Sequence, residues 1–170
     1  KYGGLCARRY SEENPDAKVQ LSKTEKRVID FIKKNFPGLR FKFNKSVLGC
    51  NRRFRPDIFY EDDSKAIVIE VDERQHKRPH PEYEQEYTEN RDRQIVKCLG
   101  KPLTIIRFNT HTYYIEGVMQ NPPIHWRTHA ITNPEEWNER LQTLKNYFLS
   151  ALTNTNLSSV PVVHWLFYDR

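Results

Sequence analysis

Residues 55–76 read RPDIFYEDDSKAIVIEVDERQH, and the expected fold is built outward from this stretch. The segments Phe54–Tyr60 and Ala66–Asp72 are rich in apolar residues, and the polar residues 61–64 lie between them. Two such segments joined by a four-residue turn predict an antiparallel β-hairpin. Side chains alternate between the two faces of a strand, and both faces of the second segment are apolar up to its acidic end. We therefore expect this second strand to be central in a sheet.

Carboxylates occupy positions of this hairpin that lie next to buried residues. Alternation puts Glu70 and Asp72 on one face of the second strand, and Asp57 lies on the strand beside them. Burying an unpaired charge costs free energy, so several acids at these positions indicate a functional role. Mg²⁺ prefers oxygen ligands and keeps several waters, so two or three carboxylates and a backbone carbonyl can hold it. The stretch therefore predicts a magnesium site that activates a water molecule.

A helix is expected to begin at Ser22, because Ser22 and Glu25 have the spacing of a capping box. Pro37 and Gly38 end it. Its apolar stripe has helical spacing and consists of Val28, Ile29, Ile32 and Phe36. Glu25 lies on the same face as this stripe. It is either a capping residue alone or a carboxylate that the helix brings to the edge of the acidic site, and the two roles are compatible.

The remaining sequence predicts alternating helices and strands. A helix that follows the central strand leads to another strand, and such a crossover makes the two strands parallel neighbours. Residues 109–131 are expected to form a long irregular segment, after which Asn133 caps a final helix. The other expected elements are a strand at 40–47, a helix at 86–99, a strand at 103–108 and an edge strand at 160–168.

Length and composition predict one ordered domain. The chain has 170 residues, of which 37% are hydrophobic and 12% aromatic, so it can bury a core and does not resemble a disordered segment. Residues 1–20 are expected to be a tail or the remnant of a preceding module, and residues 21–170 a single domain. No apolar run approaches the roughly 20 residues that cross a bilayer, so no membrane partner is expected.

The three cysteines are scattered along the chain, at Cys6, Cys50 and Cys98. An odd, scattered set fits reduced thiols in an intracellular protein better than a disulfide framework.

Positive charge is concentrated in the first third of the chain. Residues 1–55 hold 15 Lys and Arg against 5 Asp and Glu, whereas the remaining residues hold 13 against 17. A basic region beside an acidic site favours a phosphate-bearing partner, although such charge also occurs on ordinary solvated surfaces. The candidate nucleic-acid contacts are Arg52, Arg53, Arg55, Arg91, Arg93 and Arg107. The first three would grip the backbone and the others would bind phosphate, unless they form salt bridges with neighbouring acids.

The motifs and their order resemble those of the PD-(D/E)XK restriction-endonuclease-like superfamily. Pro56-Asp57 matches its PD pair and Glu70-Val71-Asp72 its (D/E)XK triplet. The extended match FRPD…IVIEVDERQH…ENRDRQIVKCLGKPLTIIRFN covers roughly residues 22–109 and is similar to very-short-patch-repair and some homing endonucleases. The resemblance implies an α/β fold with a mixed central β-sheet flanked by helices on both faces. It also implies a Mg²⁺-dependent endonuclease that hydrolyses phosphodiester bonds in DNA, with Mn²⁺ as a possible substitute.

The resemblance assigns roles to individual residues. Asp57 and Glu70 are expected to bind the metal, together with the backbone carbonyl of Val71 and with Asp72. The lysine of the family triplet is replaced by Asp72. The branch that this chain resembles commonly uses a nearby histidine instead, and His76 is the candidate for that role.

Two further residues complete the expected catalytic set. Gln75 would position a water molecule or the scissile phosphate, and Glu25 is an alternative general base. Two other functions remain open, namely a nuclease-like domain that binds DNA without cutting it and an RNA-processing nuclease of the same fold. The protein is expected to act as a monomer or a homodimer.

Overall fold

The computed structural model describes residues 22–47, 54–72, 90, 92–125, 127–156 and 158–169. The expected N-terminal tail at 1–20 lies outside these residues. No helix in the described ranges has the length and apolar character needed to cross a membrane.

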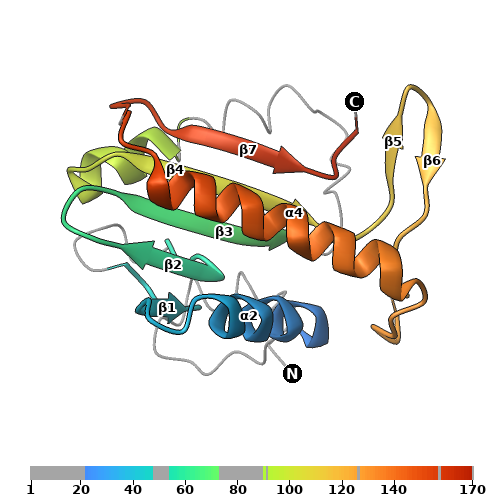
Figure 1. Cartoon of the computed structure of the whole chain (residues 1–170). Helices are drawn as coiled ribbons and strands as arrows, with labels where there is room; N and C mark the ends of the chain where they lie inside the picture. Colours follow the sequence, from blue (N-terminus) through green and yellow to red (C-terminus); the bar gives the residue numbers. More distant parts are fainter. Residues whose placement is uncertain are drawn as a thin grey trace, which may run out of the picture.

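A mixed five-stranded sheet forms the centre of the molecule (Figure 1). Neighbouring strands pair antiparallel from β1 to β3 and parallel from β3 to β7, so the predicted hairpin and crossover are both confirmed. The strand at the C-terminal end of the chain lies at the sheet edge, as expected. In spatial order the strands are β1 (Phe41–Phe43), β2 (Ile58–Glu61), β3 (Ala66–Asp72), β4 (Leu103–Asn109) and β7 (Val162–Leu166).

Strand β3 is the most deeply buried strand, and each of its seven residues is buried. The turn before it is built by Asp62, whose Oδ1 accepts hydrogen bonds from the backbone amides of Ser64 and Lys65 at 2.8 and 3.0 Å. An acid that bonds to backbone amides two and three residues later is typical of such turns. In the β2–β3 register Ile58 pairs with Ile69, which places Asp57 and Glu70 at neighbouring positions of the two strands.

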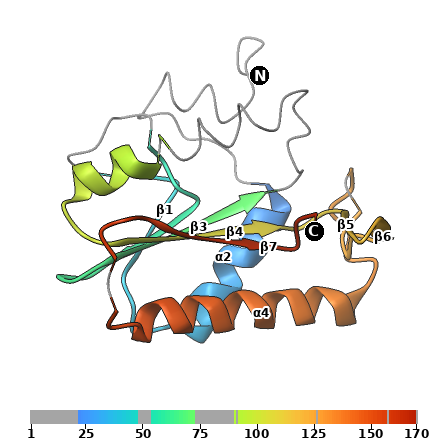
Figure 2. The same ribbon diagram turned by 90° about the horizontal axis from the view of Figure 1, so that it is seen from above.

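Helices cover both faces of the sheet, as expected (Figure 2). Helices α2 (Lys23–Asn35) and α4 (Pro134–Thr153) lie on one face and the helical residues 92–99 on the other. The alternation of β3 explains this, because Ile67, Ile69 and Val71 pack in the core under α2 and α4. Ala66 and Val68 pack in a second core with Ile95. The molecule is therefore a three-layer α/β sandwich.

The ends of the helices follow the predicted chemistry. Ser22 and Glu25 form the complete capping box that the sequence predicts. The side chain of Asn133 accepts from the backbone amide of Glu136 at 3.2 Å. At the other end of α4, Lys65 donates to the carbonyl of Leu152 at 2.7 Å and to that of the C-cap residue Asn154 at 2.6 Å. A cation at this end also opposes the negative pole of the helix.

The expectation of a fully irregular segment at 109–131 is wrong. Strands β5 (Tyr113–Ile115) and β6 (Val118–Gln120) form a short antiparallel hairpin that stands out from the end of the sheet (Figure 1). The two turn residues Glu116 and Gly117 both have positive φ, 49° and 78°. This is the geometry of a tight two-residue hairpin turn, which favours glycine.

The expectation of reduced thiols is also wrong for Cys98, the one cysteine among the described residues, because it is disulfide-bonded. A disulfide requires two Cα atoms within about 7 Å, and sequence spacing carries no information on such distances.

Candidate active site

Asp57 and Glu70 form the centre of the site, at the carboxyl end of β3. Asp57 immediately precedes β2, and the hairpin register sets it beside Glu70, which is 7% exposed. The Oδ2 atom of Asp57 accepts a hydrogen bond from the backbone amide of Val71 at 2.7 Å. The backbone of β3 thus holds the Asp57 carboxylate next to Glu70.

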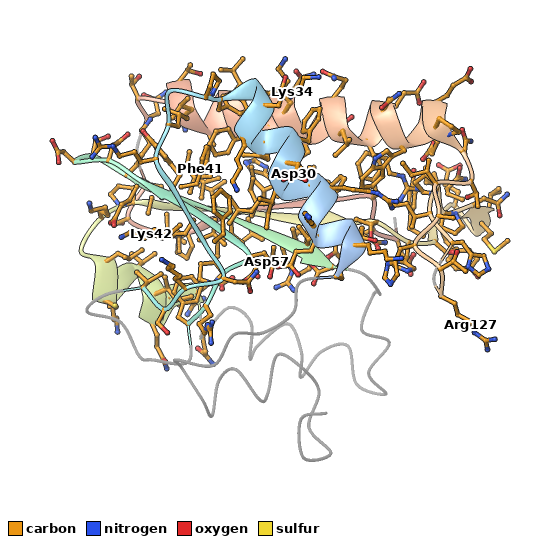
Figure 3. All side chains as sticks on the ribbon, turned by 90° about the horizontal axis from the view of Figure 1, so that it is seen from below. Asp30, Lys34, Phe41, Lys42, Asp57 and Arg127 are labelled. Atoms are coloured by element: carbon orange, nitrogen blue, oxygen red, sulfur yellow. The ribbon has the colours of Figure 1, made fainter. Side chains whose placement is uncertain are left out.

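Glu25 enters the same site from the first turn of α2. Its carboxylate accepts from the backbone amide of Ser22 at 3.4 Å and from the side-chain amide of Asn44. Its negative charge is one of those that raise the pKa of Asp57, so the two carboxylates are close. Figure 3 shows Asp57 beside the end of β3 and near the start of α2. Both roles that the sequence allows for Glu25 are therefore present, since it caps the helix and adds a carboxylate to the site.

The site concentrates negative charge around Asp57. The pKa of Asp57 lies well above its ordinary value because burial removes the carboxylate from water, and because Glu70, Glu25 and Asp72 repel its negative charge. The hydrogen bond from the Val71 amide acts in the opposite direction and is too weak to compensate. A carboxylate disfavoured in this way gains most from a nearby cation.

Asp72 is bound by two side chains from other strands or their ends, Arg107 and Tyr168. Its two oxygens accept from Arg107, Nε to Oδ2 and Nη2 to Oδ1, both at 3.1 Å, and Oδ2 also accepts from the hydroxyl of Tyr168. Burial alone would lower the pKa of Arg107, but the charge of Asp72 raises it overall. Burial and the charge of Asp72 raise the pKa of Tyr168, which keeps its hydroxyl protonated as a donor.

The donor set fits a magnesium ion held by few protein ligands. Within the part of the chain that the structure describes, no three His, Cys, Asp or Glu side chains form a ready metal-binding group. Mg²⁺ does not require one, because it keeps several waters and is commonly bound by one or two carboxylates. Asp57, Glu70 and the Val71 carbonyl supply oxygen ligands of the preferred kind, whereas both oxygens of Asp72 already accept from Arg107.

The predicted arginine contacts have different surroundings. Arg55 donates to the carbonyl of Asn44 at 2.7 Å, so it stabilises the chain that follows β1. Arg93 is exposed on the helical segment 92–99. Arg107 forms the salt bridge to Asp72 that the sequence left open as an alternative to phosphate binding. Five predicted site residues lie outside the described residues, namely Arg52, Arg53, Gln75, His76 and Arg91.

Two residues of the site were not expected from the sequence. Tyr168 is 96 positions from Asp72 along the chain, and Asn44 is 19 positions from Glu25. Neither belongs to a motif, and a tyrosine or an asparagine near a strand end is too common to single out. Only the strand order places them at the site.

No protein-family model matches the sequence, and no curated protein matches it.

Proposed function

We propose that this protein is a metal-dependent endonuclease that hydrolyses phosphodiester bonds in DNA. The observation that carries the proposal is the pair of adjacent carboxylates at the carboxyl end of β3, Asp57 and Glu70, with Glu25 close by. Like charges placed together at a sheet edge destabilise a fold, so a bound cation is the simplest reason for the arrangement. The resemblance of Pro56-Asp57 and Glu70-Val71-Asp72 to nuclease motifs supports the same interpretation.

The residues of the site have distinct tasks in this proposal. Asp57, Glu70 and the Val71 carbonyl hold Mg²⁺, or Mn²⁺ in its place. The bound metal supplies Lewis acidity, which favours deprotonation of water and neutralises charge on the phosphate. The Val71 amide orients Asp57 through its hydrogen bond, so that one carboxylate oxygen remains for the metal.

Hydrolysis also requires a proton acceptor. A water oxygen bonds to phosphorus, the phosphorus–oxygen bond to the leaving nucleotide breaks, and the leaving oxygen takes up a proton. The water loses one proton to a general base, for which His76 and Glu25 are the candidates. The basic residues of the first third of the chain bind the phosphate backbone around the cut.

The test is cleavage of supercoiled plasmid with Mg²⁺ by the wild type and by Asp57→Asn. Asparagine keeps an oxygen that can accept from the Val71 amide but loses the charge that binds metal. We expect the substitution to reduce cleavage at least about a hundredfold and EDTA to abolish wild-type cleavage. The matched control is Asp30→Asn, an exposed acid on α2 (Figure 3), which should cut at the wild-type rate.

Two results would count against the proposal. Cleavage that survives both EDTA and Asp57→Asn would exclude the metal site. Binding without cleavage of any DNA or RNA would instead favour a nuclease-like domain that only binds nucleic acid.

A further inference from the structure

Arg107 is a buried cation whose hydrogen-bonding capacity is only partly used. Its side chain is 10% exposed, and its Nε and Nη2 donate to Asp72. The face of the guanidinium lies 5.0 Å from the ring centroid of Trp165. The Tyr168 hydroxyl also interacts with the guanidinium, but among the described residues only Nε and Nη2 form hydrogen bonds of normal geometry, both to Asp72, and the third nitrogen, Nη1, forms none. Leaving donors of a buried charged group without acceptors is costly, so an acceptor from outside the fold is expected there.

The spare nitrogen belongs to a side chain beside the carboxylate pair. In the register of the two parallel strands, Arg107 on β4 is the partner of Glu70 on β3. Glu70 is also one of the charges that act on Arg107. The guanidinium therefore lies next to the site in which Asp57 and Glu70 are proposed to bind metal.

The orientation of Arg107 is determined by contacts on several sides. Asp72 holds it through two parallel hydrogen bonds, Tyr168 holds Asp72, and Trp165 covers one face of the guanidinium. Trp165 in turn packs edge-on against Tyr168, with ring centroids 5.0 Å apart. A buried ion pair adds little net stability over apolar residues of the same shape. The Asp72–Arg107 ion pair instead fixes the orientation of the guanidinium, so that Nη1 points in one direction.

We infer that Nη1 of Arg107 donates to a non-bridging oxygen of the scissile phosphate, and that Asp72 and Tyr168 are the residues that position Arg107. Guanidinium groups bind phosphate oxygens through directed hydrogen bonds. Such a donor stabilises the charge that accumulates on the phosphate oxygens during hydrolysis. Asp72 then serves Arg107 rather than the metal. This inference rests on the proposed function, because it places a phosphodiester at Asp57 and Glu70.

The first test measures phosphate contact without any cleavage. Binding of a DNA duplex is measured in EDTA over a range of salt concentrations, for the wild type and for Arg107→Gln combined with Asp72→Asn. The double substitution removes both charges together, so no unpaired charge stays buried. Losing one phosphate contact should reduce the slope of log K against log salt by about 0.9. The control is Lys101→Gln, which should leave the slope unchanged because Lys101 bonds to Glu61 and Asp62 at the opposite end of β3.

The second test separates charge from position. Arg107→Lys keeps the charge but cannot form two parallel hydrogen bonds to Asp72, so the salt slope should persist while kcat falls. Tyr168→Phe keeps the ring and removes the hydroxyl, and kcat should fall about tenfold or more with KM within about twofold of the wild type. Tyr147→Phe, on the exposed side of α4, is the matched control and should cut normally.

The outcomes distinguish the two proposals. If the wild type cuts DNA but the double variant keeps the wild-type rate and salt slope, the role of Arg107 is refuted and the nuclease stands. If the wild type binds without cutting and the double variant loses one unit of slope, hydrolysis is refuted and the phosphate contact stands. If no DNA binds at all, both fail.

Discussion

The folded state places the Asp57 carboxylate where its charged form is disfavoured. Burial and the nearby acids Glu70, Glu25 and Asp72 raise its pKa, and one hydrogen bond from Val71 does not compensate. Groups with strongly raised pKa values occur preferentially at functional sites, because function requires an arrangement that stability alone would not select.

The raised pKa predicts how stability depends on pH. The folded state favours protonated Asp57, so its contribution to stability is complete below the unfolded pKa of about 3.9 and is lost as pH rises through the higher folded value. Asp57→Asn carries no charge at any pH and avoids this loss. In EDTA at pH 8 we expect it to raise the free energy of unfolding by on the order of 1 kcal/mol or more.

Urea unfolding from pH 4 to pH 8 measures this difference. The curves of the wild type and Asp57→Asn should converge near pH 4 and separate as pH rises. Asp30→Asn should follow the wild type throughout. A variant that is less stable than the wild type at pH 8 would show that the carboxylate is stabilising, contrary to the proposed strain.

Among the described residues two arginines are buried, Arg107 and Arg140, and they differ in how many of their donors form hydrogen bonds. Arg140 is fully buried, and its donors reach Glu136 and the carbonyls of Asn109, His111 and Asn121. Tyr113 and Phe167 also lie near its guanidinium, with ring centroids at 5.0 and 4.9 Å. Its role is structural, because it ties α4 to the end of β4 and to the β5–β6 hairpin. Arg107, by comparison, donates through Nε and Nη2 to a single residue, Asp72, and its Nη1 can still donate.

At the scale of single elements, local sequence patterns are reliable where hydrogen bonding is local. The capping box of α2, the cap of α4 and the β2–β3 hairpin all form as predicted. The β5–β6 hairpin was not predicted, because its strands have only three residues each and its Glu116-Gly117 turn is a weaker signal than Asn-Gly. Its Val118 and Met119 are 63% and 53% exposed, so no clear inward and outward alternation marks it.

Adding one methyl group to Gly117, in the turn of this hairpin, should lower the free energy of unfolding. Gly117 has φ of 78° and open space around it, so Gly117→Ala adds backbone strain without a clash. We expect a loss of about 1 kcal/mol in the free energy of unfolding. The control is Gly38→Ala, where space is equally open and φ lies outside the positive range, and which should be neutral or slightly stabilising. Equal effects of the two substitutions in urea unfolding would contradict the assignment of the turn.

At the scale of the whole molecule, the parallel strands bring the site together. Strands β3, β4 and β7 point in the same direction, so their carboxyl ends meet at one edge of the sheet. Asp72 ends β3, Arg107 lies near the end of β4, and Tyr168 follows β7. In open α/β sheets this edge is where ligands usually bind.

Divalent metal should therefore stabilise the whole fold. At a free Mg²⁺ concentration ten times its Kd, binding to the folded state adds about 1.4 kcal/mol, which is a rise in Tm of about 3–6 °C for a chain of this size. The rise should be small in Asp57→Asn. Calorimetry measures Tm with Mg²⁺, and NaCl at equal ionic strength is the control. An equal rise in Tm in the wild type and in Asp57→Asn would indicate an effect unrelated to Asp57.

The sequence by itself determined the elements and the acidic pair. Period-two alternation, helix caps and turn residues act over a few positions, so they predict β3, its hairpin partner and the proximity of Asp57 to Glu70. They also place Glu25 on the inward face of α2.

Only the tertiary structure decided which groups surround that pair. The sequence offered Asp72 as a metal ligand and Arg107 as either a phosphate contact or half of a salt bridge. The register of β3 with β4 pairs Asp72 with Arg107, and the placement of β7 adds Tyr168 from 96 residues away. Contacts across parallel strands depend on how the sheet is assembled, and no local pattern encodes them. That is why the charge balance of the site could not be inferred before the fold was known.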